Sequence, residues 1–375
     1  MSRTLPVAAL VTVFSFLNSC AEERSSNWYL NGTQTQVGIQ PNGSIRVNGQ
    51  AFFPFGFYHI SWADEGTAGQ RLNDLNTIAN AGFNVMLTEP IKDTNQEMLP
   101  LLKLAEQKKL FILAHNVQPT SVKLLAQQPS LLGFTLMDDS NYNSSPAVVA
   151  RLQDTYKSLA PHKLTSITLA VASDRPESGF FGVSDSVSNM SYPIGGTDEL
   201  GVIYQVMRQT VKESQARGVV PLASLQTFAW PQRRWPSGPE LRNMTFQAVM
   251  AGIKGIAYYS YRSDGNLITD HPDLWDTAQS MAQQVRQLSP SLLNGERREL
   301  KPDGQNPSLL AVEFLGPSAR YLIALNTSSQ AQAFGMTLSD TRTLRPLFSD
   351  SGMVFNSGRL KGTMGPLAVQ VYEVN

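Results

Sequence analysis

The sequence is poor in cysteine and histidine. Its 375 residues include one cysteine, Cys20, which excludes an intramolecular disulfide. The four histidines show no close ligand spacing of the kind found in an HExxH helix. We therefore predict no metal site. The four are His59, His115, His162 and His271.

A net charge and the glycine-rich motifs of several enzyme classes are also missing. Lysine and arginine together number 30, as do aspartate and glutamate, so no overall field draws nucleic acid to the chain. No glycine-rich phosphate turn follows an early strand, which argues against a nucleotide cofactor. No Gly-x-Ser-x-Gly elbow supports a Ser-His-Asp hydrolase. We expect no cofactor and no nucleic-acid partner.

The first 20 residues have the pattern of an export signal. Arg3 supplies a positive charge, 5–17 is nearly all apolar, and Leu17-Asn18-Ser19-Cys20 forms a processing point. The apolar run is too short for a comfortable membrane span. The lone cysteine after such a run resembles the lipobox of bacterial lipoproteins. That resemblance implies lipidation of Cys20 and anchoring to a lipid bilayer of the bacterial cell envelope, periplasmic or cell-surface. The alternatives are a non-acylated secretory signal and a cysteine that stands there by chance.

Strand and helix patterns alternate after a predicted flexible tether at 21–36. Residues 37–52 carry turn signals and predict a hairpin that closes the bottom of a barrel. Eight strand–helix units follow over about 240 residues, the expected size of a (β/α)8 TIM barrel. A doubly wound open sheet is the alternative. The eight predicted strands are 53–59, 84–88, 110–114, 131–137, 167–171, 186–191, 219–225 and 255–259.

The apolar pattern changes to period two after Pro290, with short strands separated by Gly, Pro, Asn and Ser. This pattern predicts a small antiparallel β-sandwich. We therefore expect two domains, a barrel over 37–290 and a C-terminal β-sandwich over 291–375, the second packing on the first.

The predicted fourth strand ends in two adjacent carboxylates, Asp138 and Asp139. Barrels present their functional groups at the carboxyl ends of the strands. Strand alternation would send the two side chains in opposite directions, so at most one is expected to face a substrate. Either Asp could instead cap the following helix.

The other predicted strand ends are rich in aromatic, amide and charged side chains. Aromatic planes cover the apolar faces of sugars, and the polar groups exchange hydrogen bonds with hydroxyls, so this face suits a polyhydroxylated ligand. Any one aromatic residue could instead pack beneath a loop. The residues expected there are Tyr58, His59, Glu89, His115, Asn189, Tyr192, Gln226, Phe228, Trp230, Arg233, Arg234, Trp235, Tyr259, Tyr261 and Asp264.

Five motifs in this order resemble the clan A glycoside hydrolases and their barrel relatives, over most of residues 44–290. The motifs are Phe53-Pro54-Phe55-Gly56-Phe57-Tyr58, Gly133-Phe134-Thr135-Leu136-Met137-Asp138-Asp139, Ser191-Tyr192-Pro193, Gln226-Thr227-Phe228 and Gly255-Ile256-Ala257-Tyr258-Tyr259-Ser260-Tyr261. The resemblance implies a general acid/base at Asp139, with Asp138 in the supporting position before it. A C-terminal β-sandwich is also frequent among such enzymes.

Two departures from that family leave three interpretations open. Asp139 is one methylene shorter than the family's Glu, and Gln226 replaces the nucleophilic Glu after strand seven, so no glycosyl ester can form there. Glu89, Asp264 or Asp64 could activate a water in an inverting reaction. A substrate N-acetyl group could instead act as nucleophile beside Asp138 and Asp139. Finally, the barrel could bind sugar without turnover.

The sequence therefore predicts a membrane-anchored glycoside hydrolase acting on an oligo- or polysaccharide. Asp139 is the expected general acid, with Asp138 and Glu89 as further catalytic candidates and Gln226 orienting a hydroxyl or a water. The alternative is an inactive barrel that binds carbohydrate or serves as a scaffold lipoprotein of the envelope.

Overall fold

Eight parallel strands close into a barrel in the computed structural model, which describes residues 34–59, 68–171, 177–263, 265–338, 343–348 and 352–375. The strands pair in chain order, and β10 closes the ring by pairing with β11, which also pairs with β4. This confirms the predicted (β/α)8 fold. The strands are β4 (Phe55–His59), β5 (Val85–Thr88), β6 (Phe111–His115), β7 (Leu131–Met137), β8 (Leu164–Leu169), β9 (Ser186–Ser191), β10 (Val220–Gln226) and β11 (Ile256–Ser263).

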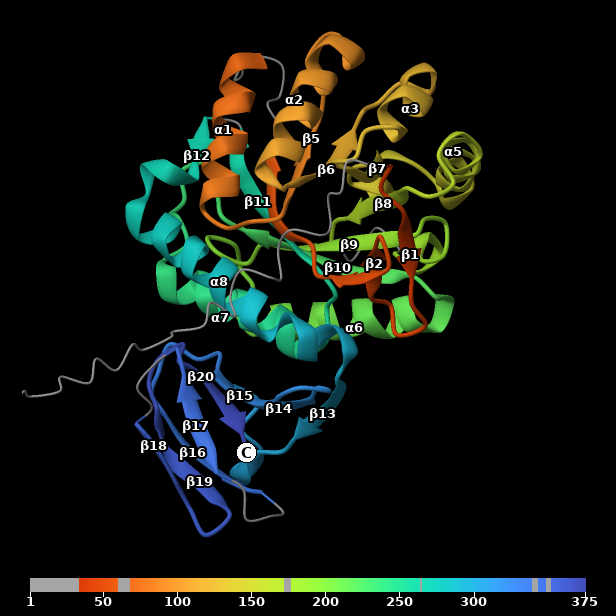
Figure 1. The fold of residues 1–375 in the computed structure, drawn as a ribbon. Helices are drawn as coiled ribbons and strands as arrows, with labels where there is room; N and C mark the ends of the chain where they lie inside the picture. The colour runs from red at the N-terminus through yellow and green to blue at the C-terminus, as the bar shows by residue number, and fades with distance from the viewer. Residues whose placement is uncertain (1–33, 60–67, 172–176, 264, 339–342, 349–351) are drawn as a thin grey trace, which may run out of the picture.

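Helices surround the ring and cover its outer face (Figure 1). Between β8 and β9 the described residues hold the 3-10 turn η1 (Ser178–Phe180). The helices are α1 (Ala68–Asn80), α2 (Thr94–Lys108), α3 (Pro119–Ala126), α4 (Ser140–Asn143), α5 (Pro146–Leu159), α6 (Val202–Arg217), α7 (Gly238–Ala251) and α8 (Pro272–Asn294).

A small antiparallel sheet closes the amino-terminal end of the barrel. It has three strands, β1 (Val37–Ile39), β2 (Ile45–Val47) and β3 (Gln50–Phe52), where the sequence predicted a two-stranded hairpin. The side chains of Ile45 and Phe52 join one apolar cluster with inward-facing barrel residues such as Leu113 and Leu222. These apolar side chains therefore fill the barrel at its amino-terminal end, and the polar strand ends lie at its carboxyl-terminal end.

The last helix runs past the predicted domain boundary. Pro290 lies inside α8, where the sequence suggested that the barrel had ended. Proline removes the backbone donor that would bond the carbonyl four residues earlier, which belongs to Arg286. The Ser289 hydroxyl donates to that carbonyl at 2.9 Å and replaces the missing bond.

Two antiparallel sheets form the C-terminal part, as the period-two pattern predicted. The strands of the five-stranded sheet alternate between two cores: Ile323 packs into the cluster shared with the barrel helices, and Leu322 faces the three-stranded sheet. One sheet is β13 (Glu296–Leu300), β14 (Leu309–Leu315), β15 (Arg320–Asn326), β20 (Val369–Val374) and β17 (Leu344–Leu347); the other is β16 (Gln332–Thr337), β19 (Arg359–Met364) and β18 (Met353–Asn356).

The C-terminal sheets lie beside α7 and α8, below the barrel in Figure 1. Two polar side chains, Asn243 and Arg297, form hydrogen bonds inside this contact. The Asn243 amide of α7, fully buried at 0% exposure, donates to the backbone carbonyls of Asn326 at 2.8 Å and Leu367 at 3.0 Å. Arg297 donates from Nε to the Met250 carbonyl at 2.6 Å. Barrel and sandwich are thus joined by hydrogen bonds as well as by apolar packing.

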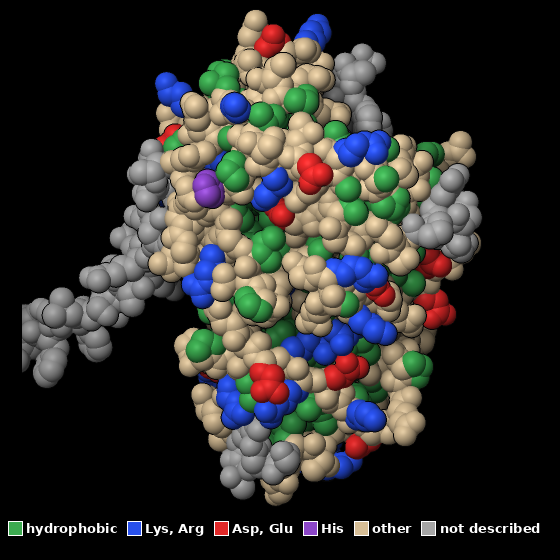
Figure 2. Space-filling model, turned by 90° about the vertical axis from the view of Figure 1, so that its right-hand side faces the viewer, with side chains coloured by type: hydrophobic (Ala, Val, Ile, Leu, Met, Phe, Trp, Pro, Cys, Tyr) green, Lys and Arg blue, Asp and Glu red, His purple; other side chains and the backbone are tan. Residues whose placement is uncertain are grey.

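Charges of both signs are interspersed over one face of the molecule (Figure 2). Among the helices that the structure describes, none combines the length and the apolar character needed to cross a membrane.

Replacing the buried amide tests the junction between barrel and sandwich. Asn243→Ala should lower the free energy of unfolding by about 1–3 kcal/mol, because two carbonyls lose their donor inside a dry contact. Urea unfolding measures this change. Asn294→Ala is the matched control, since its amide bonds Pro290 from an exposed position. Equal losses in both variants would contradict the assigned role of Asn243.

Candidate active site

The end of β7 brings two carboxylates to the mouth of the barrel. The register of β7 shifts against both neighbouring strands, and β8 passes so close at Gly133 that a Cβ there would lie 1.9 Å from the Leu164 carbonyl oxygen. Asp139 then adopts a left-handed conformation (φ 45°, ψ 47°) at the start of α4. Regular strand alternation stops there, and Asp138 and Asp139 both line the cleft. The prediction that only one could face a substrate is therefore wrong.

Thr168 of β8 holds this turn. Its hydroxyl donates to Asp138 Oδ1 and accepts the backbone N–H of Asp139 at 2.8 Å. Burial and the nearby charge of Asp138 hold the pKa of the Tyr58 hydroxyl, at the end of β4, well above its ordinary value. Tyr58 therefore stays protonated beside the carboxylate pair.

Asp139 has a different environment from its neighbour. Its side chain is half-buried, and Oδ1 makes no hydrogen bond. Burial and the negative charge of Asp138 raise the pKa of Asp139 from 3.8 to about 6. Loss of water and a like charge both disfavour the ionised form. A carboxylic acid that holds its proton in mildly acidic solution thus faces the cleft.

Aromatic rings form the wall next to the carboxylates. Tyr192 and Tyr259 stack with their centroids 5.7 Å apart, and Phe228 meets Trp230 edge-on at 4.8 Å. Trp230 is 39% exposed, so much of its ring is available for contact. The cleft has a volume of about 700 Å³. Its lining is Asp138, Asp139, Met190, Tyr192, Phe228, Ala229, Trp230, Pro231, Gln232, Arg233, Tyr259, Ser263 and Asn266.

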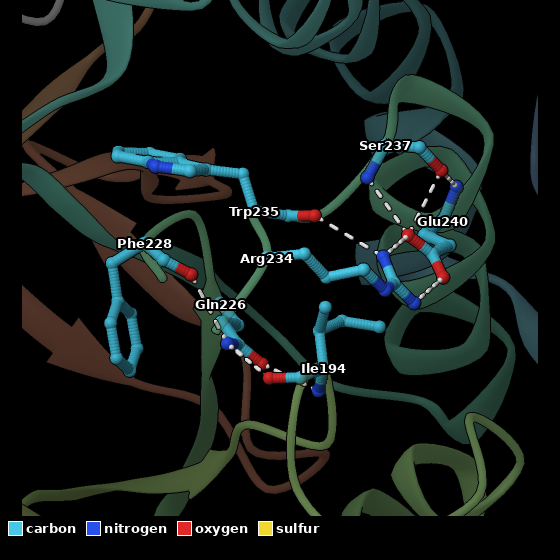
Figure 3. Close-up of polar contacts among 7 residues, drawn as sticks. All are labelled: Ile194, Gln226, Phe228, Arg234, Trp235, Ser237 and Glu240. Atoms are coloured by element: carbon cyan, nitrogen blue, oxygen red, sulfur yellow. Dashed lines mark hydrogen bonds and ion pairs between the residues drawn. The ribbon is translucent and has the colours of Figure 1, made fainter. Parts of the chain in front are cut away.

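Gln226 does not belong to this lining. Its side chain has 0% exposure and accepts the Ile194 backbone N–H at 2.8 Å. It donates to the carbonyls of Ile194 at 2.9 Å and Phe228 at 3.1 Å, so both amide hydrogens are used (Figure 3). The predicted substrate contact is corrected: Gln226 ties the segment after β9 to the segment after β10.

Three other predicted contacts lie between the strands and the helices. His59 bonds Asp74 of α1 at 2.8 Å, and its ring stacks on Tyr261 at 5.9 Å. Asn189 donates to Glu177 at 2.9 Å and Thr210 of α6 at 3.0 Å. None of these three lines the cleft, which corrects the prediction for His59, Tyr261 and Asn189. Polar residues at strand ends here also fasten helices to the barrel.

Glu89 and His115 form a separate buried group. Asn116 donates to Glu89, and His115 Nδ1 lies 3.6 Å from the same carboxylate. Neither Glu89 nor His115 is among the described residues that line the cleft. Three further residues named from the sequence, Cys20, Asp64 and Asp264, lie outside the described part of the chain.

Several lining residues were not singled out from the sequence. Met190 sits inside β9, and Ser263 and Asn266 flank the turn between β11 and β12 (Asn266–Leu267). The Asp264-Gly265 pair between them is a hairpin signal. That signal could have predicted a short hairpin beside the cleft.

Comparison with known proteins identifies the fold. No family model matches the chain, and no curated protein matches its sequence. A solved glycoside hydrolase shares 12% identity at a TM-score of 0.61, over 91% of this chain and 97% of its own. An Anoxybacillus alpha-amylase shares 13% identity at a TM-score of 0.60, over 85% and 97%. The alpha-amylase of Geobacillus thermoleovorans, complexed with acarbose, shares 13% identity at 0.59, over 86% and 97%. At these identities the likeness establishes a common fold, a barrel followed by a β-rich part.

Proposed function

We propose that this protein is a glycoside hydrolase that acts on an oligo- or polysaccharide, with Asp139 as general acid. The observation that carries the proposal is the pairing of two carboxylates in unlike environments under an aromatic wall. Asp138 accepts a hydrogen bond from Thr168, whereas Asp139 is left without one and its pKa rises to about 6. Two carboxylates that lie side by side in different environments are typical of acid–base catalysis.

The shape and lining of the cleft favour a saccharide. Trp230 and Tyr259 offer ring surface, and the carboxylates, Gln232 and Asn266 offer hydrogen-bond partners. Solved structures of this fold include an alpha-amylase complexed with acarbose and AmyP in complex with maltose, the latter at a TM-score of 0.56 and 10% identity. These saccharide complexes support the same class of ligand here.

The nucleophile is best supplied by the substrate. The Gln226 side chain is hydrogen-bonded to backbone groups, so it is not available to the substrate. Among the described lining residues, the carboxylates are Asp138 and Asp139, which are adjacent in the chain. An acetamido oxygen would attack the anomeric carbon while the glycosidic C–O bond breaks and Asp139 gives its proton to the leaving oxygen. Asp138 accepts the acetamido N–H. Water then opens the cyclic intermediate, and its proton passes to Asp139.

A sugar-binding barrel without turnover is the second candidate. One reason is that the Gln226 side chain bonds backbone groups and does not line the cleft. A second is that, among the described lining residues, no acid from another strand faces Asp138 and Asp139. The two candidates share the cleft and differ in whether Asp139 transfers its proton.

We also propose that Cys20 is acylated and anchors the protein to an envelope membrane. Residues 34–37 join the barrel at its amino-terminal end, where Val37 bonds the His162 carbonyl at 2.9 Å and Gln34 bonds Ala126 at 3.0 Å. The described chain therefore begins at the barrel end opposite the cleft. The cleft would face away from the membrane and toward a polymer outside it.

Asp139→Asn tests the catalytic assignment. With chitohexaose and other acetamido oligosaccharides as substrates, kcat/KM should fall about 10²–10⁴-fold, because the amide cannot donate the proton. Wild-type kcat/KM should decline as the pH rises above about 6, where Asp139 ionises. Asp198→Asn, an exposed change beyond β9, should leave both unchanged. Full activity in Asp139→Asn removes Asp139 from the mechanism.

The same substitution should stabilise the protein. A carboxyl whose pKa rises on folding contributes stability that is complete below its unfolded pKa of about 4 and is lost as the pH rises through 6. Asn carries no charge and tolerates the left-handed backbone. Asp139→Asn should therefore gain about 1–3 kcal/mol at pH 7.5 and much less at pH 4 in urea unfolding. An equal gain at both pH values would contradict the charge argument.

Cys20→Ser tests the anchor. Because the chain has no other cysteine, labelled palmitate should no longer be incorporated and the protein should leave the membrane fraction. Ser19→Ala keeps the thiol and a small residue before it, and should remain membrane-bound. If Cys20→Ser sediments with membranes as wild type does, the acyl anchor is wrong.

A further inference from the structure

One segment supplies about half of the cleft lining. Phe228 to Arg233, directly after β10, contribute six consecutive lining residues. The segment is braced at both ends. Gln226 holds its start through Ile194, and Arg234 holds its end through two contacts with Glu240 at 2.6 and 2.8 Å (Figure 3). Its side chains are therefore presented from a fixed backbone rather than a loose loop.

Arg233 is seated beside Trp230 within this segment. Its backbone N–H donates to the Trp230 carbonyl at 2.8 Å. Across from both lies Gly195, at φ +79°, where a Cβ would come within 2.9 Å of Arg233 Cβ and 3.5 Å of Trp230 Cδ1. A glycine at this position leaves room for the arginine stem. The stem of Arg233 and the exposed indole of Trp230 thus lie on the same side of Gly195, and both residues line the cleft.

The two neighbouring arginines differ in their partners. Arg234 forms its ion pair with Glu240, which also accepts the Ser237 backbone N–H at 2.8 Å (Figure 3). Arg233 is exposed and forms no ion pair with any acidic side chain that the structure describes. The cleft therefore contains a cation available to a ligand, on the same wall as the aromatic surface.

We propose that Arg233 is a specificity determinant that binds a carboxylate of the substrate, so that the preferred substrate is an acidic glycan. This inference rests on the proposed saccharide function of the cleft and names its substrate class. A guanidinium fork matches a planar carboxylate with two parallel hydrogen bonds. A sugar ring stacked on Trp230 would place a carboxylate substituent at its edge within reach of that fork.

Matched glycans test the charge preference directly. The probes are hexasaccharides of hyaluronan, polygalacturonate and alginate, each compared with the same oligosaccharide after reduction of its carboxylates to hydroxymethyl groups. Calorimetry uses the full chain with Asp139→Asn, so that ligand is not consumed. We expect at least one acidic member to bind about tenfold or more tightly than its neutral partner, with the preference shrinking at high salt.

The variants assign that preference to Arg233. Arg233→Gln should remove it by weakening acidic ligands while leaving neutral ones unchanged. Arg233→Lys should retain part of it, because the charge stays and the fork is lost. Gly195→Ala should reduce it by displacing the arginine stem. Arg298→Gln, an equal change of net charge on an exposed residue of the sandwich, should not alter it.

The outcomes separate this inference from the proposed function. Equal binding of acidic and neutral partners, or equal loss of both in Arg233→Gln, overturns the role of Arg233 and leaves a saccharide cleft. The same effect in Arg298→Gln overturns it in favour of general charge attraction. No binding of any member overturns the acidic-glycan inference, and activity on chitohexaose then decides the proposed function separately. A preference for hyaluronan, the probe that carries acetamido groups, without its turnover in the wild type retains Arg233 and rejects the hydrolase.

Discussion

The Thr168 hydroxyl is the contact on which the candidate site depends. It donates to the Asp138 carboxylate and accepts the Asp139 backbone N–H, and so joins the ends of β7 and β8. The left-handed turn at Asp139 follows directly from the end of β7 and turns the second acid toward the cleft. The Asp138 carboxylate accepts a hydrogen bond, whereas Asp139 Oδ1 accepts none. The two acids therefore differ in their local environment.

The carboxyl-terminal face of the barrel serves two purposes. Asp138, Asp139 and the aromatic wall line the cleft, while other polar strand ends fasten the surrounding structure. The group of His59, Asp74 and Arg262 joins β4, α1 and β11 through bonds of 2.8 Å. Gln226 shows the same division, since it occupies the position of an expected catalytic carboxylate yet holds two backbone segments together. A strand-end location alone therefore does not make a residue part of the cleft.

Rigidity of the cleft wall follows from the same bracing. The wall from Phe228 to Arg233 is fixed between the Gln226 amide and the Arg234–Glu240 pair (Figure 3). A wall held at both ends presents Trp230 and Arg233 in one arrangement and reduces the ordering cost when a ligand binds. If the cleft binds a saccharide as proposed, this bracing contributes to affinity from outside the carboxylate pair.

The order of elements, the barrel and the C-terminal sheets could be predicted from the sequence, because hydrophobic periodicity and strand length are local properties of the chain. The Asp138–Asp139 pair was found in the same way, at the end of an apolar strand. Which polar strand ends face the cleft could not be predicted. That depends on bulges and a left-handed residue at the end of β7, and on partners distant in the chain, such as Thr168 for Asp138, Asp74 for His59 and Ile194 for Gln226. Only the folded chain brings these groups within hydrogen-bonding distance.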